Sequence, residues 1–179
     1  QSPLPGAVGA CGPRGRRGFC RIGPVIFATV GTQLPYPRLI RALDRLATEI
    51  DEPIIAQTGP DPRPYPNLDL RLYLTPSAFR ALVSEARLIV AHAGVGTILT
   101  ARDFGKPLVL LPRRHAEGEH RNDHQMATAR EVARHPGIHV AWEASDLARL
   151  LMRRDLSLPG PGGTSRPQLV QRIRDFIDN

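Results

Sequence analysis

Short apolar runs recur along the chain and alternate with longer segments in which apolar residues are spaced as on a helix. The first run, Val25 to Val30, is rich in β-branched residues and ends at Gly31, and a second run from Ile54 to Gln57 is closed by Gly59. Continuous apolar runs of this length are typical of parallel strands buried on both faces. The pattern predicts strands at residues 25–30, 54–57, 68–74, 87–92, 106–112 and 137–142.

Leucine, isoleucine and valine at helical spacing fill the segments between these strands. Thr75 followed by Pro76 predicts a helix that starts with a threonine N-cap and a proline in its first turn. Gly105 is predicted to end the next helix, and Ser145 to cap a short one. The predicted helices lie within residues 39–50, 75–86, 96–105, 122–134, 146–152 and 168–179, and the last is amphipathic.

Strands that alternate with helices at this rhythm predict an α/β fold. We expect a Rossmann-like parallel sheet with helices on both faces and right-handed crossovers, in one domain at residues 24–179 of the 179-residue chain. Residues 1–23 are rich in Gly, Pro and Arg without periodicity, so we expect a disordered or poorly ordered tail. Residues 153–166 are expected to form a flexible connector to the terminal helix.

Charge and composition narrow the function classes. The net charge of +7 leaves a nucleic acid or an anionic membrane surface open as a partner. Apart from Lys106 the cationic residues are all arginines spread along the chain, without interleaved aromatic residues for base stacking, so we expect no nucleic-acid partner. Cys11 and Cys20 lack zinc-ligand spacing, and we expect no structural zinc. With no apolar run of roughly 20 residues and no secretory pattern, we expect a cytoplasmic protein.

The segment "HAGVGT" follows the fourth predicted strand and begins a helix. His92 lies at the tip of the strand, Gly94 and Gly96 leave backbone N–H groups uncrowded, and Thr97 adds a hydroxyl group. Free N–H groups and the macrodipole at such a helix start favour a bound phosphate. From these residues alone, a glycine-rich turn beside a buried histidine remains the alternative.

Two further polar segments follow predicted strands, where ligands of open α/β sheets bind. "TVGTQ" carries Gly31 and Thr32 after the first strand, and "EGEHRNDHQ" carries Glu119, His124 and Gln125 after the fifth. Amide and carboxylate groups there suit the hydroxyls of a sugar, and a solvated loop is the alternative.

Three histidines in and just before the last segment make a metalloenzyme the rival interpretation. They are His115, His120 and His124. Their spacing does not form the H-E-x-x-H pattern of zinc enzymes, so we expect no metal site.

Four separated motifs together resemble a known family. "IFATVGTQLPYPRLIRALD", "AHAGVGTIL", "GKPLVLLPR" and "GEHRNDHQ" occur in order between Pro24 and Trp142. They are similar to the C-terminal, donor-binding domain of glycosyltransferase family 28. The likeness is strongest to its short stand-alone form, which includes catalytic subunits of bacterial exopolysaccharide β-1,4-glucuronosyltransferases and of the dolichol-linked UDP-GlcNAc transferase. The resemblance implies an architecture equivalent to the C-terminal half of a GT-B glycosyltransferase.

The resemblance also implies a site that binds a UDP-sugar as substrate and acts with inversion, without a metal or another cofactor. One position departs from the family pattern: Thr100 stands where many relatives carry a glutamate that pairs with the ribose hydroxyls, and Asp103 is the candidate replacement. Carried over to this chain, the cleft is lined by Gly31 and Thr32, the diphosphate is held by His92, Gly94, Gly96 and Thr97, and the sugar meets Glu119, His124 and Gln125.

The implied function is that of a donor-binding subunit that transfers a hexosyl or glycuronosyl group from a UDP-sugar to a lipid-linked glycan acceptor. An acceptor-binding half does not fit within 179 residues, so the resemblance implies a separate, membrane-anchored partner subunit. That partner would supply the general base and hold the enzyme peripherally at the membrane. The alternative is a non-catalytic nucleotide-sugar-binding or regulatory module, and a basic nucleic-acid-binding protein comes third.

Overall fold

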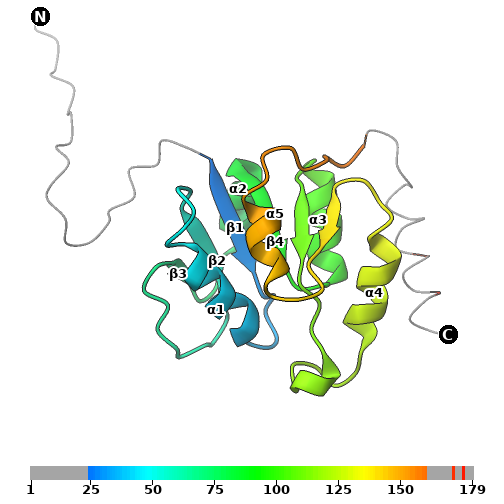
Figure 1. The fold of residues 1–179 in the computed structure, drawn as a ribbon, viewed down its shortest axis with the longest axis horizontal. Helices are drawn as coiled ribbons and strands as arrows, with labels where there is room; N and C mark the ends of the chain where they lie inside the picture. The colour runs from blue at the N-terminus through cyan, green and yellow to red at the C-terminus, as the bar shows by residue number, and fades with distance from the viewer. Residues whose placement is uncertain (1–23, 161–170, 172–174, 176–179) are drawn as a thin grey trace, which may run out of the picture.

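The computed structural model describes residues 24–160 together with Gln171 and Asp175. Its strands form a parallel sheet in the order β3-β2-β1-β4-β5-β6, so the chain winds outward from β1 to one edge and from β4 to the other (Figure 1). The predicted Rossmann-like α/β fold is confirmed. The strands are β1 (Val25–Thr29), β2 (Ile54–Gln57), β3 (Asp69–Arg71), β4 (Ala86–Ala91), β5 (Leu108–Leu110) and β6 (Ile138–Val140).

Helices cover both faces of this sheet, with α1 and α5 on one side and α2, α3 and α4 on the other (Figure 1). Each helix in the described part of the chain is too short and too polar to cross a membrane. The helices are α1 (Pro37–Leu46), α2 (Pro76–Glu85), α3 (Val95–Asp103), α4 (His124–Val132) and α5 (Asp146–Leu151), with a 3-10 turn, η1 (His115–Glu117), before α4.

The central strand β1 explains why the short runs that form the strands are almost entirely apolar. Ile26 and Ala28 pack into the core beneath α1 and α5, whereas Phe27 packs into the core beneath α2 and α3. All five residues of β1 are therefore buried. A strand covered on both faces has no solvent side on which a polar residue could be placed.

The third strand is shorter than the predicted range of 68–74. Its pairing with β2 spans only Asp69 to Arg71, and the next residues leave the sheet. Leu72 and Tyr73 are 57% and 59% exposed, so their apolar character does not reflect burial in this structure.

Helix starts agree with the sequence fully in one case and in part in another. The hydroxyl of Thr75 accepts a hydrogen bond from the N–H of Ala78, with Pro76 as the first helical residue, as predicted. Ser145 occupies the N-cap position of α5, as predicted, but its side chain makes no capping bond. Instead the carboxylate of Asp146 accepts from the N–H groups of Trp142 and Glu143 and fixes the turn before α5.

Residues 153–160 of the predicted connector have no regular secondary structure, yet part of this segment packs against the sheet. Leu156 is buried in the core, and the hydroxyl of Ser157 accepts a hydrogen bond from the N–H of Gly137 just before β6. Gly137 has a φ of 83°, and a Cβ atom there would lie 2.4 Å from the nitrogen of Pro159. Only glycine fits this crossing.

Other expectations fall outside the described residues. These are the tail at 1–23 with Cys11 and Cys20, the connector residues 161–166, and the helix predicted at 168–179 apart from Gln171 and Asp175.

Candidate functional site

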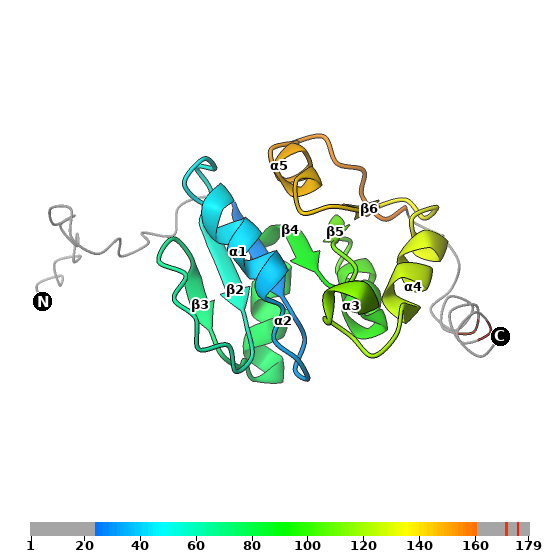
Figure 2. The same cartoon turned by 60° about the horizontal axis from the view of Figure 1, so that its bottom comes forward.

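The loops that follow β1, β4 and β5 lie together at the carboxyl ends of the strands, which point downward in Figure 1 and are tilted toward the viewer in Figure 2. The strand order reverses between β1 and β4, which is where open α/β sheets bind their ligands. These loops line a cavity of about 760 Å³, a size suited to a small molecule. Of the predicted site residues, the cavity is lined by Gly31, Thr32, His92, Gly94, Gly96, Thr97 and Gln125.

The imidazole ring of His92 lies against the backbones of two glycines from different loops. A Cβ atom on Gly94 would lie 2.3 Å from Nε2 of His92, and one on Gly31 would lie 2.9 Å from Cε1. Gly31 also has a φ of 79°, which disfavours any side chain. Gly96 differs, because a Cβ atom there would meet nothing within 4 Å. The first two glycines are thus required by the histidine ring, and the third is not.

His92 is a neutral donor in this site. Burial is the main cause that lowers its pKa to about 4, and the positive charge of Arg113 lowers it further. At neutral pH the ring therefore carries one N–H group and no charge. Its buried Nδ1 atom has no hydrogen-bond partner among the described residues.

The start of α3 supplies backbone donors beside this ring. Gly94 is the N-cap and offers no capping side chain, and the first bond of the helix runs from the N–H of Ile98 to the carbonyl of Gly94. The N–H groups of Val95, Gly96 and Thr97 have no acceptor in the described part of the chain. Such a helix start attracts an anion through its free N–H groups and its dipole.

Cationic side chains complete the lining. Arg80 and Arg113 line the cavity, and among its described lining residues there is no carboxylate. Arg113 is only 2% exposed and lies just beyond β5, from which Leu111 and Pro112 separate it. Arg113 is not among the site residues predicted from the sequence. The available signal was its position immediately beyond the end of a strand.

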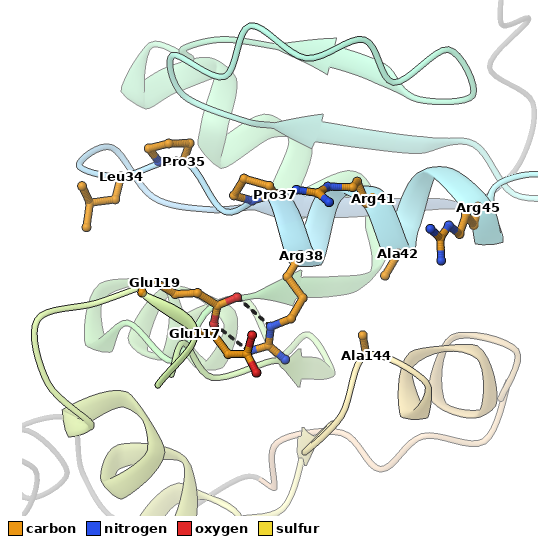
Figure 3. A pocket seen from close by; sticks show the side chains of 11 residues that line it. Leu34, Pro35, Pro37, Arg38, Arg41, Ala42, Arg45, Glu117, Glu119 and Ala144 are labelled. Atoms are coloured by element: carbon orange, nitrogen blue, oxygen red, sulfur yellow. Dashed lines mark hydrogen bonds and ion pairs between the residues drawn. The ribbon is translucent and has the colours of Figure 1, made fainter. Parts of the chain in front are cut away.

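The "EGEHRNDHQ" segment divides between two places. Gln125 lies at the cavity, where its Oε1 atom accepts from the N–H of Arg113 at 3.1 Å. His124 begins α4 and is exposed, and it does not line the cavity. Glu119 lies on a neighbouring groove of about 600 Å³, shown in Figure 3. The structure therefore brings one of these three predicted residues to the main cavity and leaves two outside it.

Glu119 is held by an ion pair. Its carboxylate accepts from Nε of Arg38 at 2.7 Å and from a second guanidinium nitrogen at 2.8 Å, as the dashed lines in Figure 3 show. It also accepts from the N–H of Arg114 at 2.9 Å. With its side chain 9% exposed, Glu119 holds the loop before α4 against α1 and is not available to a ligand in the main cavity.

Thr100 and Asp103 concern the ribose-binding glutamate that the family pattern led us to expect. Thr100 lines the cavity, and its hydroxyl donates to the carbonyl of Gly96 at 2.8 Å. Asp103 ends α3 and is not among the lining residues, so it does not take the place of the glutamate expected at Thr100. His120 also lines the cavity, and its Nδ1 atom lies 3.0 Å from Oδ1 of Asn122.

The rival interpretation as a metalloenzyme requires side chains grouped around a metal ion. Among the described residues, no three side chains of histidine, cysteine, aspartate or glutamate are grouped to hold a metal ion. The ring of His115 instead contacts the carbonyl of His120 at 3.1 Å.

Alanine substitutions at Gly94 and Gly96 test the contact between the α3 loop and the His92 ring, because only a side chain at Gly94 would meet that ring. Gly94→Ala is expected to displace the ring of His92 and to lower the free energy of unfolding by about 2 kcal/mol, as overpacking does. Gly96→Ala, the matched control, is expected to raise it by up to about 1 kcal/mol, because alanine favours a helix. Chemical denaturation and the NMR signals of His92 measure both effects. Equal stability changes in the two variants would contradict this geometry.

The low pKa of His92 predicts a pH dependence of stability. In the unfolded chain the histidine pKa is about 6.5, so between pH 6.5 and pH 4 the unfolded state binds a proton that the folded state does not. The folded protein should therefore lose roughly 3 kcal/mol of stability from this residue as the pH falls from 7 to 4. Urea unfolding of the wild type and of His92→Asn at several pH values isolates this contribution. Parallel pH profiles would refute it.

Comparison with known proteins supports this fold. The model of the glycosyltransferase family 28 C-terminal domain matches residues 25–137, whereas none of the curated proteins matches the chain. The crystal structure of the glycotransferase of kitacinnamycin is similar with a TM-score of 0.59 and 19% identity, covering 93% of this chain and 42% of that one. The solution structure of ALG13 is similar with a TM-score of 0.58 and 15% identity, covering 87% of this chain and 98% of that one.

A third similar structure is that of UDP-glucose: anthocyanidin 3-O-glucosyltransferase in complex with UDP, with a TM-score of 0.54 and 15% identity, covering 86% of this chain and 36% of that one. At these identities the likenesses show the fold. The chain spans about two fifths of the length of the kitacinnamycin enzyme. The family match extends over more than half of the chain and includes β1, β4, α3 and β5, which carry the cavity. The chain belongs to glycosyltransferase family 28 and contains the C-terminal domain of that family.

Proposed function

We propose that this chain is the donor-binding part of a glycosyltransferase and that its main cavity binds a UDP-sugar. One observation carries the proposal: loops from three strands meet at a cavity whose described lining holds two arginines and no carboxylate. A site with this charge favours a dianionic or more highly charged ligand. One of the similar structures holds UDP, which is the ligand that family membership suggests here.

In this proposal the diphosphate lies at the start of α3. The N–H groups of Gly96 and Thr97 would donate to its oxygens, and the neutral ring of His92 would add a third donor. Gly31 and Thr32 would lie on the other side of the diphosphate, because the ring of His92 lies against Gly31. Gln125 would approach the sugar from the start of α4.

Transfer requires that the departing UDP be stabilised as its negative charge grows. Backbone donors and a buried cation, Arg113, that are already in place can do this without reorganisation. We therefore propose an inverting, metal-independent transfer of a hexosyl or glycuronosyl group, with the UDP-sugar as substrate and no further cofactor.

The acceptor side is proposed to come from a second protein. The chain covers about two fifths of the kitacinnamycin enzyme, so a comparable enzyme needs further residues to bind an acceptor. We propose a membrane-anchored subunit that presents a lipid-linked glycan, supplies the general base and keeps this chain peripheral at the membrane.

A second candidate function is a non-catalytic nucleotide-sugar-binding or regulatory module. It is favoured by the absence of a carboxylate from the described cavity lining and by the low pKa of His92, which makes that ring a weak base. Donor binding is common to both candidates, and turnover separates them.

Calorimetric titration with UDP tests the binding site. The wild type is expected to bind UDP, and His92→Ala is expected to bind it about tenfold more weakly, the effect of one lost hydrogen bond to a charged group. His124→Ala is the matched control, because it removes an exposed histidine outside the cavity, and it should bind like the wild type. A wild-type protein without UDP affinity, or a His92→Ala variant with full affinity, would refute the assignment.

Sugar transfer is expected only when the chain is combined with an acceptor-binding membrane subunit. Turnover from a radiolabelled UDP-sugar to a lipid-linked acceptor should persist in EDTA if no metal takes part. His120→Ala locates the base: normal turnover agrees with a base on the partner, whereas lost turnover with retained UDP affinity would place the base on this chain. A pair that binds UDP and transfers no sugar from any donor would favour the non-catalytic module.

A further inference from the structure

Arg113 joins two loops that are separated by a strand. Its guanidinium donates to the carbonyls of Val30 at 3.2 Å, Leu34 at 2.7 Å and Pro35 at 2.8 Å, and makes a longer bond of 3.4 Å to the carbonyl of Glu119. Because β4 lies between β1 and β5, this side chain reaches across the end of β4, where His92 lies. Arg113 thus holds both ends of the loop that carries Gly31 and Thr32.

An aromatic ring supports the guanidinium from one side. The central carbon of the Arg113 guanidinium lies 4.4 Å from the centroid of the Tyr36 ring, a cation–π geometry. The hydroxyl of Tyr36 donates to the carbonyl of Pro112 at 3.0 Å and accepts from Arg38 at 2.9 Å. The position of Arg113 is therefore fixed by contacts on both its polar edge and its face.

The charge of Arg113 has no direct counterion in the described part of the chain. Two less buried arginines do: Arg38 is paired with Glu119, and Arg87 with Glu52, each at 2.7 Å. Every acceptor of the Arg113 guanidinium is a neutral backbone carbonyl. A cation that is 2% exposed without a carboxylate partner is costly to bury, and a bound anion in the adjoining cavity would offset that cost.

We propose that Arg113 is the positioning residue for the diphosphate of the donor: its guanidinium shapes the loop of Gly31 and Thr32, and its positive charge favours an anion beside His92. This inference rests on the proposed function and names the group that makes the cavity selective for a diphosphate over an uncharged nucleoside. Arg113 acts through the loop and through its field, since two of its nitrogens already donate to four carbonyls.

Arginine is the side chain that can do both tasks. Its planar fork presents several N–H donors in fixed directions, so a single group can hold carbonyls from separate loops. A lysine keeps the charge but offers a compact ammonium group that cannot span the same acceptors. Lysine and glutamine substitutions therefore separate the geometry from the charge.

The experiment compares two ligands, UDP and uridine, in three variants by calorimetry. Arg113→Lys loses the fork and is expected to bind UDP about three- to tenfold more weakly, and Arg113→Gln, which also loses the charge, about thirtyfold more weakly or worse. Uridine affinity should stay within about twofold in both, because uridine carries no phosphate. Arg87→Gln is the control, since Arg87 also donates to two backbone carbonyls but at the opposite end of the sheet.

The outcomes distinguish this inference from the proposed function. If the wild type binds neither UDP nor uridine, the proposed function fails, and the proposed role of Arg113 fails with it. A wild type that binds UDP, with UDP and uridine equally weakened in Arg113→Lys, shows a purely structural arginine and overturns the inference. Unchanged UDP affinity in Arg113→Lys overturns it as well. If Arg113→Gln fails to fold, the lysine variant alone decides.

NMR titration of the His92 ring gives a readout that does not depend on any ligand. Arg113 and His120 are the charged or titratable groups whose charges lower the pKa of His92. Loss of the Arg113 charge in Arg113→Gln should raise that pKa, whereas Arg113→Lys should leave it closer to the wild-type value. A His92 pKa that is the same in all three proteins would contradict a field from Arg113 in the cavity.

Discussion

Steric contact between one imidazole ring and two glycine backbones determines how closely the loops after β1 and β4 approach each other. A single methyl group on Gly31 or Gly94 would overlap the ring of His92. Arg113 secures the loop after β1 from the far side through backbone carbonyls. The loops at the carboxyl ends of the strands therefore hold their positions before any ligand binds. Preorganisation of this kind reduces the ordering entropy that binding would otherwise have to overcome.

The main cavity and the neighbouring groove, both at the carboxyl ends of the strands, differ in charge. The main cavity is lined by arginines without a carboxylate, whereas the neighbouring groove is lined by both arginines and glutamates, among them the ion pair of Arg38 and Glu119 (Figure 3). Leu34, 45% exposed, borders both. An anion therefore meets arginines alone on one side of Leu34 and a mixture of arginines and carboxylates on the other. This difference favours the main cavity as the place for a phosphorylated ligand.

The buried strands could be predicted because a strand covered on both faces consists of apolar residues throughout. The third strand was predicted too long, because Leu72 and Tyr73 continue the apolar pattern although both are more than half exposed. Glu119 could not be placed from sequence, since its position depends on Arg38, 81 residues earlier. Arg113 was missed for a related reason: the carbonyls that allow its burial belong to a distant loop. The glycines of the fourth-strand loop were noticed for their possible approach to phosphate, whereas Gly94 is required by a neighbouring side chain.

The crossing of Pro159 over Gly137 has a consequence for association between molecules. A parallel sheet exposes unpaired N–H and C=O groups along its outermost strands, and these can template pairing with another chain. Here Ser157 approaches the backbone of Gly137 and the ring of His139 along β6, and β3 at the other border is three residues long and carries the ion pair of Asp69 and Arg71. The chain itself thus contacts the start of β6, whereas β3 is limited by its brevity and charge. Loss of the fit at Gly137 would expose β6 and favour intermolecular strand pairing.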